Sequence, residues 1–226
     1  MTNETGKKFE CEYEKSLRRY ADLLASYRSA RLTGTRDAGE IYDLHIRDSL
    51  YSIELLPQAG EIIDVGSGGG LPGMVWAICR PDLEVTLLDS MRKKCRAMTE
   101  IAAALSLKNV SVTWARCEEF SAAARERYAL ASARALAHVG IVAEYLSPLV
   151  ARGGKAMAFK GPKGLKELEE VGNKWSIIGL SNPQILPYGD DRNFNYNFVI
   201  WEKISPTPPS YPRKTGAASA VGWWVS

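Results

Sequence analysis

The sequence predicts an α/β protein with a seven-stranded, mostly parallel sheet and an N-terminal helical extension. Two patterns support this prediction. From residue 61 onward, short apolar segments of strand length alternate with longer segments of helical periodicity, and strands that alternate with helices form a parallel sheet covered on both faces. Before residue 58 the helical spacing stands alone, which places a helical extension ahead of the sheet.

The N-terminal extension is expected to be helical over residues 15–56. Apolar side chains recur at i, i+3 and i+4 within 17–27 and again within 46–56, as on the buried face of an amphipathic helix. The segment 33–37 between these two runs contains glycine and threonine and predicts a loop.

Seven segments have the character of strands, and four have the character of helices. The expected strands lie at 61–65, 84–88, 110–114, 129–133, 155–159, 185–188 and 195–203, and the expected helices run from the glycine cluster to about 79 and over 91–107, 139–148 and 163–175. The last two strands have a connection too short for a parallel crossover, which takes about a dozen residues, so we expect an antiparallel hairpin.

The remaining organisation follows from composition. The tail 205–226 is rich in proline, glycine, serine and alanine, and we expect it to be poorly ordered. The expected division is therefore a helical extension at 1–58, the main α/β domain at 59–204 and a flexible tail.

Composition and charge restrict the possible partners. The net charge is +3 over 226 residues, which permits an RNA partner without requiring one. The four cysteines and two histidines are scattered, so we expect no metal site and free thiols in a reducing cytoplasm. The N-terminus lacks the apolar run of a secretory signal, and no stretch of 18 apolar residues occurs; we therefore expect a cytoplasmic protein with no membrane span.

A glycine cluster follows the first strand and admits two interpretations. Glycines at a strand–helix turn let the backbone approach a ligand, and the helix N-terminus offers free N–H donors. Gly66-x-Gly68-x-Gly70, preceded by Asp64, is the form typical of S-adenosylmethionine-dependent methyltransferases. Reading from Gly68 to Gly73 instead gives the dinucleotide fingerprint G-x-G-x-x-G. A structural turn that binds no ligand is the third possibility.

Acidic residues after the next two strands help to separate these interpretations. Asp89 ends the second strand, where both cofactor classes place an acid for ribose hydroxyls, so it does not discriminate. Cys117 and Glu118 follow the third strand, where methyltransferases often place an acid for the adenine amino group. A solvated carboxylate at a helix start is the alternative for Glu118.

Longer motifs resemble one family. The run Asp64–Gly73 (DVGSGGGLPG), followed by 86–90 (TLLDS), resembles the RsmG (GidB) family of bacterial small-subunit rRNA methyltransferases. Supporting segments are Leu32-Thr33, 45–50 (HIRDSL), 108–110, 118–120, Arg134-Ala135, 159–161 and 211–214 (YPRK). The chain departs from the family pattern at Arg31, at Leu44 and in the tail 217–226.

The resemblance implies a Rossmann-like class I methyltransferase that moves a methyl group from S-adenosylmethionine to guanine N7 in the 530 loop of 16S rRNA. The small ribosomal subunit would be its partner, and the chain would act as a monomer. The implied cofactor-binding residues are Gly66, Gly68, Gly70, Leu71, Asp89, Cys117, Glu118 and Arg134.

The implied chemistry needs little acid–base catalysis. The methyl group on a sulfonium is already electrophilic, and guanine N7 carries no proton at neutral pH. Catalysis would come mainly from alignment, so no catalytic residue is expected. Arg134 and Lys160 end the fourth and fifth strands, where they could position the cofactor carboxylate or an RNA phosphate. A surface lysine at a strand end is the alternative for Lys160.

Further basic residues are candidates for RNA binding. Arg28, Arg31 and Arg36 lie in the N-terminal segment, and Arg92 and Lys93 open the helix after Asp89, followed by Lys94 and Arg96. Phosphate contact is plausible for both groups, with a solvated helix face as the alternative. His45, Trp114 and Tyr128 are expected to pack in the interior rather than to contact a ligand.

Three other functions remain open at this stage. One is a methyltransferase for a small molecule, and another is a nicotinamide-dependent oxidoreductase that uses the overlapping glycine register. The third is a protein that binds a cofactor or RNA without catalysis.

Overall fold

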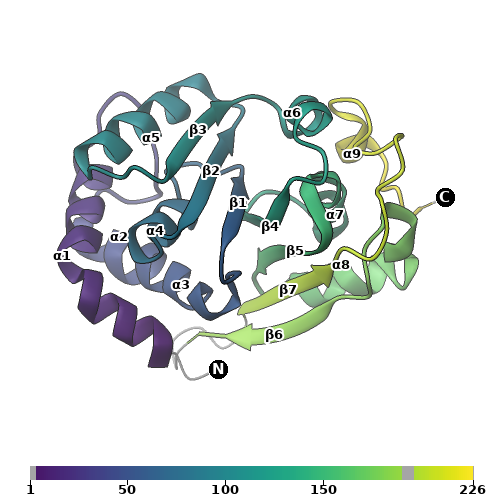
Figure 1. Ribbon diagram of the computed structural model, residues 1–226, viewed down its shortest axis with the longest axis horizontal. Coiled ribbons are helices and arrows are strands. Elements are labelled where there is room, and N and C mark those ends of the chain that lie inside the picture. The colour runs from purple at the N-terminus through teal and green to yellow at the C-terminus, as the bar shows by residue number, and fades with distance from the viewer. Residues whose placement is uncertain (1–3, 190–195, 226) are drawn as a thin grey trace. The chain divides into compact units, whose positions relative to one another are not determined.

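The computed structural model describes residues 4–189 and 196–225. They form two compact units, one of residues 4–115 and one of residues 116–189 with 196–225. Within these described residues the seven strands belong to one mostly parallel sheet, to which the N-terminal unit contributes β3-β2-β1 and the C-terminal unit β4-β5-β7-β6 (Figure 1). The α/β fold class and the seven-stranded sheet predicted from the sequence are confirmed.

The sheet of the N-terminal unit is fully parallel. Its strands are β1 (Gly60–Val65), β2 (Leu83–Asp89) and β3 (Val110–Trp114), connected through α4 (Gly73–Cys79) and α5 (Arg92–Ala104). Most residues of β1 and β2 are buried, as expected for parallel strands covered by helices. Helix α5 ends three residues before the expected Leu107, because Ser106 adopts a left-handed φ of 59° and the Leu107 amide turns back to the Ala102 carbonyl.

The N-terminal helices pack within the same unit. They are α1 (Glu4–Ser26), α2 (Ala38–Ile41), the π-helical turn η1 (Tyr42–Ile46), α3 (Arg47–Leu50) and the 3₁₀ turn η2 (Ile53–Leu55). Helix α1 starts eleven residues before the expected Lys15 and buries Leu17, Tyr20 and Leu24 along one face. Because α1 packs against α4, the expected boundary at residue 58 does not separate two compact bodies.

The C-terminal unit combines parallel and antiparallel pairing. Its elements are α6 (Cys117–Ala123), β4 (Tyr128–Arg134), α7 (Val139–Leu146), η3 (Ser147–Leu149), β5 (Val150–Lys160), α8 (Gly164–Val171), η4 (Lys174–Ile178), β6 (Gln184–Tyr188), β7 (Tyr196–Glu202) and α9 (Ala217–Ala220). Strands β6 and β7 form the predicted antiparallel hairpin; the expected strand start at Asn195 lies outside the described residues. The helix expected over 163–175 stops at Gly172, whose φ of 63° ends α8.

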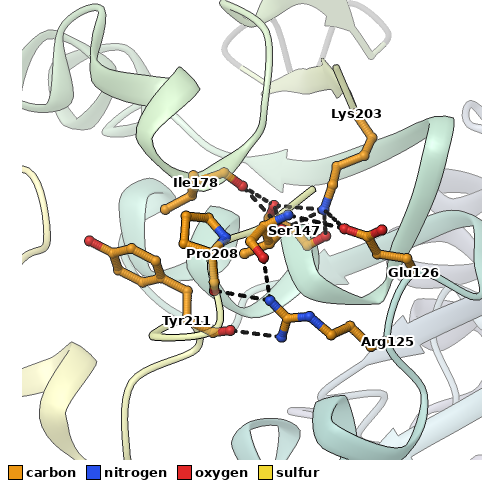
Figure 2. A network of polar contacts seen from close by, with 8 residues as sticks. Arg125, Glu126, Ser147, Ile178, Lys203, Pro208 and Tyr211 are labelled. Carbon is orange, nitrogen blue, oxygen red and sulfur yellow. Dashed lines mark hydrogen bonds and ion pairs between the residues drawn. The ribbon is translucent and has the colours of Figure 1, made fainter. Parts of the chain in front are cut away.

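The tail does not follow the expectation of a poorly ordered segment. The Arg125 guanidinium donates hydrogen bonds to the carbonyls of Thr207, Pro208 and Tyr211 (Figure 2). Trp223 is 3% exposed and donates its indole N–H to the Gly140 carbonyl at 2.8 Å. Composition suggested disorder, but one arginine satisfies three backbone carbonyls and a buried tryptophan anchors the end of the tail.

A buried lysine lies at the centre of this tail contact. The Lys203 ammonium contacts the Ser147 carbonyl at 2.6 Å, the Thr207 hydroxyl, and a Glu126 carboxylate oxygen at 3.3 Å (Figure 2). Burial lowers the pKa of Lys203, while Glu126 opposes that change. All donors of the ammonium are used inside the unit, so the cluster fastens the tail to η3 and β7.

No helix in the described part of the chain is long and apolar enough to cross a membrane. No group of three or more histidine, cysteine or acidic side chains there could hold a metal ion. The four cysteines are free thiols, of which Cys11 is exposed and Cys79, Cys95 and Cys117 are buried.

Candidate functional site

The glycine loop between β1 and α4 is a tight turn anchored to β2. The amides of Gly66 and Ser67 donate to the Leu88 carbonyl at 2.8 and 3.1 Å, and the Ser67 hydroxyl donates to the Asp64 carbonyl at 2.6 Å. Gly66, Gly68 and Gly70 all have positive φ, which side chains other than glycine rarely adopt. The three predicted glycines of the methyltransferase register therefore all adopt a backbone conformation that favours glycine.

Asp89 connects the glycine loop to the end of β2. One carboxylate oxygen accepts the Gly68 amide at 2.9 Å, and the other accepts the Met91 amide at 2.8 Å. The side chain is 6% exposed. Because each carboxylate oxygen has a second lone pair, Asp89 can hold both loops and still accept a hydroxyl from a ligand.

The surroundings of the glycines define which side of the loop is open. A Cβ on Gly69 would lie 3.1 Å from the Leu32 carbonyl, and one on Gly73 would lie 2.3 Å from Leu87. A Cβ on Gly68 would meet nothing closer than the Gly66 carbonyl at 3.9 Å. The open side of the loop is therefore at Gly68, next to Asp89.

Helix α1 covers the other side of the loop. The Tyr20 hydroxyl donates to the Gly69 carbonyl at 2.9 Å and is fully buried. A Cβ on Gly70 would approach the same hydroxyl to 3.1 Å. Tyr20 thus supports the loop from behind, a role that the sequence did not reveal because the two residues lie 49 positions apart.

In the C-terminal unit, Cys117 and Glu118 begin helix α6. The Cys117 thiol is buried, donates to the Tyr145 carbonyl at 3.4 Å and has its pKa raised to about 12 by burial. A Glu118 oxygen accepts the Tyr145 hydroxyl at 3.3 Å, and burial together with Glu118 raises the pKa of Tyr145 to about 12. Tyr145 therefore stays a hydrogen-bond donor that orients Glu118.

Arg134 and Lys160 end β4 and β5, as the sequence predicted. Ala135 has a left-handed φ of 52°, so the chain turns sharply directly after Arg134; such strained backbone is concentrated at functional sites. Lys160 is only 12% exposed, and its ammonium contacts Glu167 at 2.6 Å and the Ala137 carbonyl at 2.9 Å. Its interactions are thus internal, and it is not the solvated strand-end lysine considered as the alternative.

The N-terminal basic residues lie on an exposed surface around the end of α1. Arg28, Arg31 and Arg36 are all exposed. Arg28 and Arg36, together with Arg19, line a shallow hollow of about 460 Å³. The Arg31 guanidinium instead donates to the Gly34 carbonyl at 3.0 Å within its own loop. Arg19 was missed because only the structure shows which face of α1 it occupies.

Of the aromatic and histidine side chains expected in the interior, Trp114 does not lie there. Tyr128 is 1% exposed, as expected, and His45 is half-buried in η1. Trp114 is 57% exposed, and its ring lies 5.3 Å from the guanidinium of Arg92. The prediction for Trp114 was wrong because β3 is the edge strand of the sheet, which leaves no neighbour to cover a large side chain at its end.

Comparisons with known proteins agree with the fold and with the motifs. A family model described as rRNA small subunit methyltransferase G (GidB) matches residues 13–194. The ribosomal RNA small subunit methyltransferase G of Moorella thermoacetica is 35% identical over 225 residues, covering 96% of this chain and 92% of that protein. The protein of the same name from Rubrobacter xylanophilus is 38% identical over 221 residues, covering 93% and 84%.

Among solved structures, a tRNA methyltransferase from Aquifex aeolicus aligns with a TM-score of 0.57 at 13% identity, covering 84% of this chain and 76% of that one. A 16S rRNA adenine methyltransferase from Catenulisporales acidiphilia, solved with S-adenosylmethionine, aligns with a TM-score of 0.52 at 13% identity, covering 71% and 92%. At these identities the likeness establishes the fold.

Proposed function

This chain belongs to the GidB family, rRNA small subunit methyltransferase G, and we propose that it transfers the methyl group of S-adenosylmethionine to N7 of a guanine in the 530 loop of 16S rRNA. The observation that carries the proposal is the glycine loop held open at Gly68 beside the buried carboxylate of Asp89. The chain would act as a monomer in the cytoplasm, where ribosomal subunits are found.

The residues of the loop fit S-adenosylmethionine. The open side of Gly68 leaves room for a ligand against the backbone, and the free lone pairs of Asp89 suit the two ribose hydroxyls. Gly66, Gly70 and Leu71 would shape the cradle. In the C-terminal unit, the family resemblance assigns Cys117, Glu118 and Arg134 to the same cofactor, with Glu118 accepting the adenine amino group.

The bound cofactor would supply a methyl group that is electrophilic because it is carried by a sulfonium. Guanine N7 offers an in-plane lone pair and has no proton to lose. The protein would therefore act by holding the two reactants in line and by excluding water, which accounts for large rate enhancements without a general base. The thiol of Cys117 would not act as a nucleophile, since burial raises its pKa to about 12.

The substrate RNA would be held mainly by phosphate contacts. The exposed side chains of Arg28, Arg31 and Arg36 near α1, and of Arg92 and Lys93 on α5, supply cations for such contacts. Lys160 would position the 134–139 segment rather than bind RNA directly, because its ammonium is already engaged by Glu167 and Ala137.

Tritium-labelled S-adenosylmethionine, incubated with small subunits from a strain lacking this enzyme, tests the proposal. We expect one labelled guanine in the 530 loop, located by primer extension after cleavage at 7-methylguanine. Label confined to small metabolites would refute the rRNA substrate. Naked 16S rRNA and a partially assembled particle, assayed in parallel, identify the form that the enzyme accepts.

A further inference from the structure

An exposed tryptophan lies at the end of β3 in the N-terminal unit. Trp114 is 57% exposed, whereas Trp76, Trp175, Trp201 and Trp223 are each no more than 3% exposed. A large aromatic side chain left in water forgoes the free energy of burial. Neither the core of the unit nor the cofactor residues assigned above account for it.

The ring of Trp114 is fixed in place rather than free to rotate. Its indole N–H donates to the Ser90 carbonyl at 3.0 Å, and the guanidinium of Arg92 lies 5.3 Å from the ring centre. A guanidinium over an aromatic face is attracted by the ring's electron density. The tryptophan is thus held as a rigid platform by the loop that follows β2.

The platform lies beside the ribose acid. Trp114 is the register partner of Asp89 in the parallel pairing of β2 with β3, and the Ala115 amide donates to the Asp89 carbonyl at 3.2 Å. Adjacent strands are about 4.8 Å apart. The backbone that carries Trp114 is therefore one strand away from the residue proposed to hold the cofactor ribose.

Two exposed basic side chains and a second exposed apolar side chain follow Ser90, which accepts the Trp114 indole N–H. Arg92 and Lys93 are exposed on the first turn of α5, and Met91, the neighbour of Ser90, is 52% exposed. The arrangement therefore pairs apolar surface with positive charge. An unpaired nucleotide offers the complementary features, because its base has an apolar face and its phosphate is an anion.

We propose that Trp114 is a stacking platform for an unpaired base of the rRNA substrate, with Arg92 and Lys93 contacting the adjoining phosphates. The proposal rests on the rRNA methyltransferase activity and specifies how the substrate is gripped. Single-stranded nucleic acids are commonly held by aromatic stacking alongside basic side chains, and N7 in an A-form helix lies in a deep, narrow groove, so the target loop must present unstacked bases.

Steady-state kinetics on small subunits from a strain lacking the enzyme test the platform. For Trp114→Ala we expect KM for the subunit to rise about tenfold, in the range of one lost base stack, while kcat stays within about twofold of the wild type. Trp114→Phe keeps a ring and should recover most of the loss. Leu44→Ala, which removes a 54% exposed side chain elsewhere in the same unit, is the matched control and should leave KM unchanged.

Acrylamide quenching of tryptophan fluorescence provides a test that needs no turnover. Trp114 is 57% exposed, whereas Trp224 is only partly exposed and the other four tryptophans are buried, so the difference between wild type and Trp114→Phe isolates its signal. A short single-stranded RNA of the 530-loop sequence should shield that signal from acrylamide. If wild-type enzyme failed to methylate subunits, the proposed function would fall, while shielding would still support the platform.

Two outcomes would overturn the proposal. One is an unchanged KM for Trp114→Ala together with no shielding by the RNA. The other is a weakened affinity of Trp114→Ala for S-adenosylmethionine in calorimetry with an unchanged KM for the subunit, which would assign the ring to the cofactor adenine.

Discussion

The carboxylate of Asp89 holds the amide of Gly68 at 2.9 Å. The same side chain accepts the Met91 amide through its other oxygen, so it fixes the glycine loop and the turn before α5 together. Replacing Asp89 with Asn turns one of these acceptors into a donor that faces an N–H group. We expect Asp89→Asn to weaken S-adenosylmethionine binding by at least about tenfold, measured by calorimetry, since a hydrogen bond to a charged acceptor contributes about 1.5–3 kcal/mol.

Asp82→Asn is the matched control for this substitution. Asp82 directly precedes β2, at the opposite end of that strand from Asp89, and its half-exposed carboxylate pairs with Arg80. Cofactor affinity should not change in this variant. Equal loss of affinity in both variants would mean that Asp89 acts only through overall stability.

The cysteines should differ sharply in reactivity. Cys11 is exposed, whereas burial raises the pKa of both Cys79 and Cys117 to about 12 and also raises that of Cys95. Because the thiolate is the reactive form, a native-state thiol titration at pH 8 should modify one cysteine, and Cys11→Ser should abolish the reaction. Rapid modification of Cys117 in the native state, detected by mass spectrometry, would contradict the buried site.

The buried thiols of Cys79 and Cys117 should make the stability of the fold decrease at high pH. An acid whose pKa is higher in the folded state than in the unfolded state stabilises the fold fully below the unfolded value. For the thiols of Cys79 and Cys117 the ordinary pKa is 9.0, and burial in the fold raises the pKa to about 12. We expect the urea midpoint of unfolding to fall as the pH rises from about 9 toward 12, and to fall less in Cys79→Ala.

Two variants distinguish a structural role of Lys160 from a direct contact with RNA. Glu167 accepts both the Lys160 ammonium at 2.6 Å and the Val139 amide at 2.7 Å, so the pair joins β5, α7 and α8. Lys160→Met and Glu167→Gln should lower the thermal midpoint by similar amounts. If Lys160 instead bound a phosphate, Lys160→Met would reduce the salt dependence of RNA binding by about one unit of slope. That change in Lys160→Met, without the same change in Glu167→Gln, would refute the structural role.

Local patterns made the core of this structure predictable. Strand β1 is mostly buried and is followed by glycines with positive φ, and the apolar run and the glycine cluster that lead to these features are both visible in the sequence. The same holds for α5, whose apolar spacing located it within three residues. Asp89 and Gly68 lie within hydrogen-bonding distance because Asp89 ends β2 and Gly68 follows the carboxyl end of β1, and these two strands are parallel neighbours.

Long-range placement was not predictable in the same way. The support of Gly69 by Tyr20 depends on how α1 packs, and the exposure of Trp114 depends on β3 being an edge strand. The tail was expected to be disordered because its composition is rich in small residues and proline. Its anchoring partners, Arg125 and Glu144, lie in distant parts of the chain, and composition carries no information about them.

The anchoring of the tail by Arg213 leads to a stability prediction. The Glu144 carboxylate is fully buried and accepts the Arg213 guanidinium at 2.9 and 2.7 Å as well as its backbone amide at 2.8 Å. Removing one partner of a buried pair leaves an uncompensated charge, which costs about 3–5 kcal/mol. We therefore expect Arg213→Met to lower the free energy of unfolding by about 3 kcal/mol in urea and to expose residues 205–225 to limited proteolysis.

Two further variants control for the loss of charge. The double variant Glu144→Leu with Arg213→Met removes both charges and should recover part of this loss. Arg18→Met breaks an exposed pair with Glu14 and should change the free energy of unfolding by less than about 1 kcal/mol. Wild-type stability and protease resistance in Arg213→Met would show that the tail is not held by this pair.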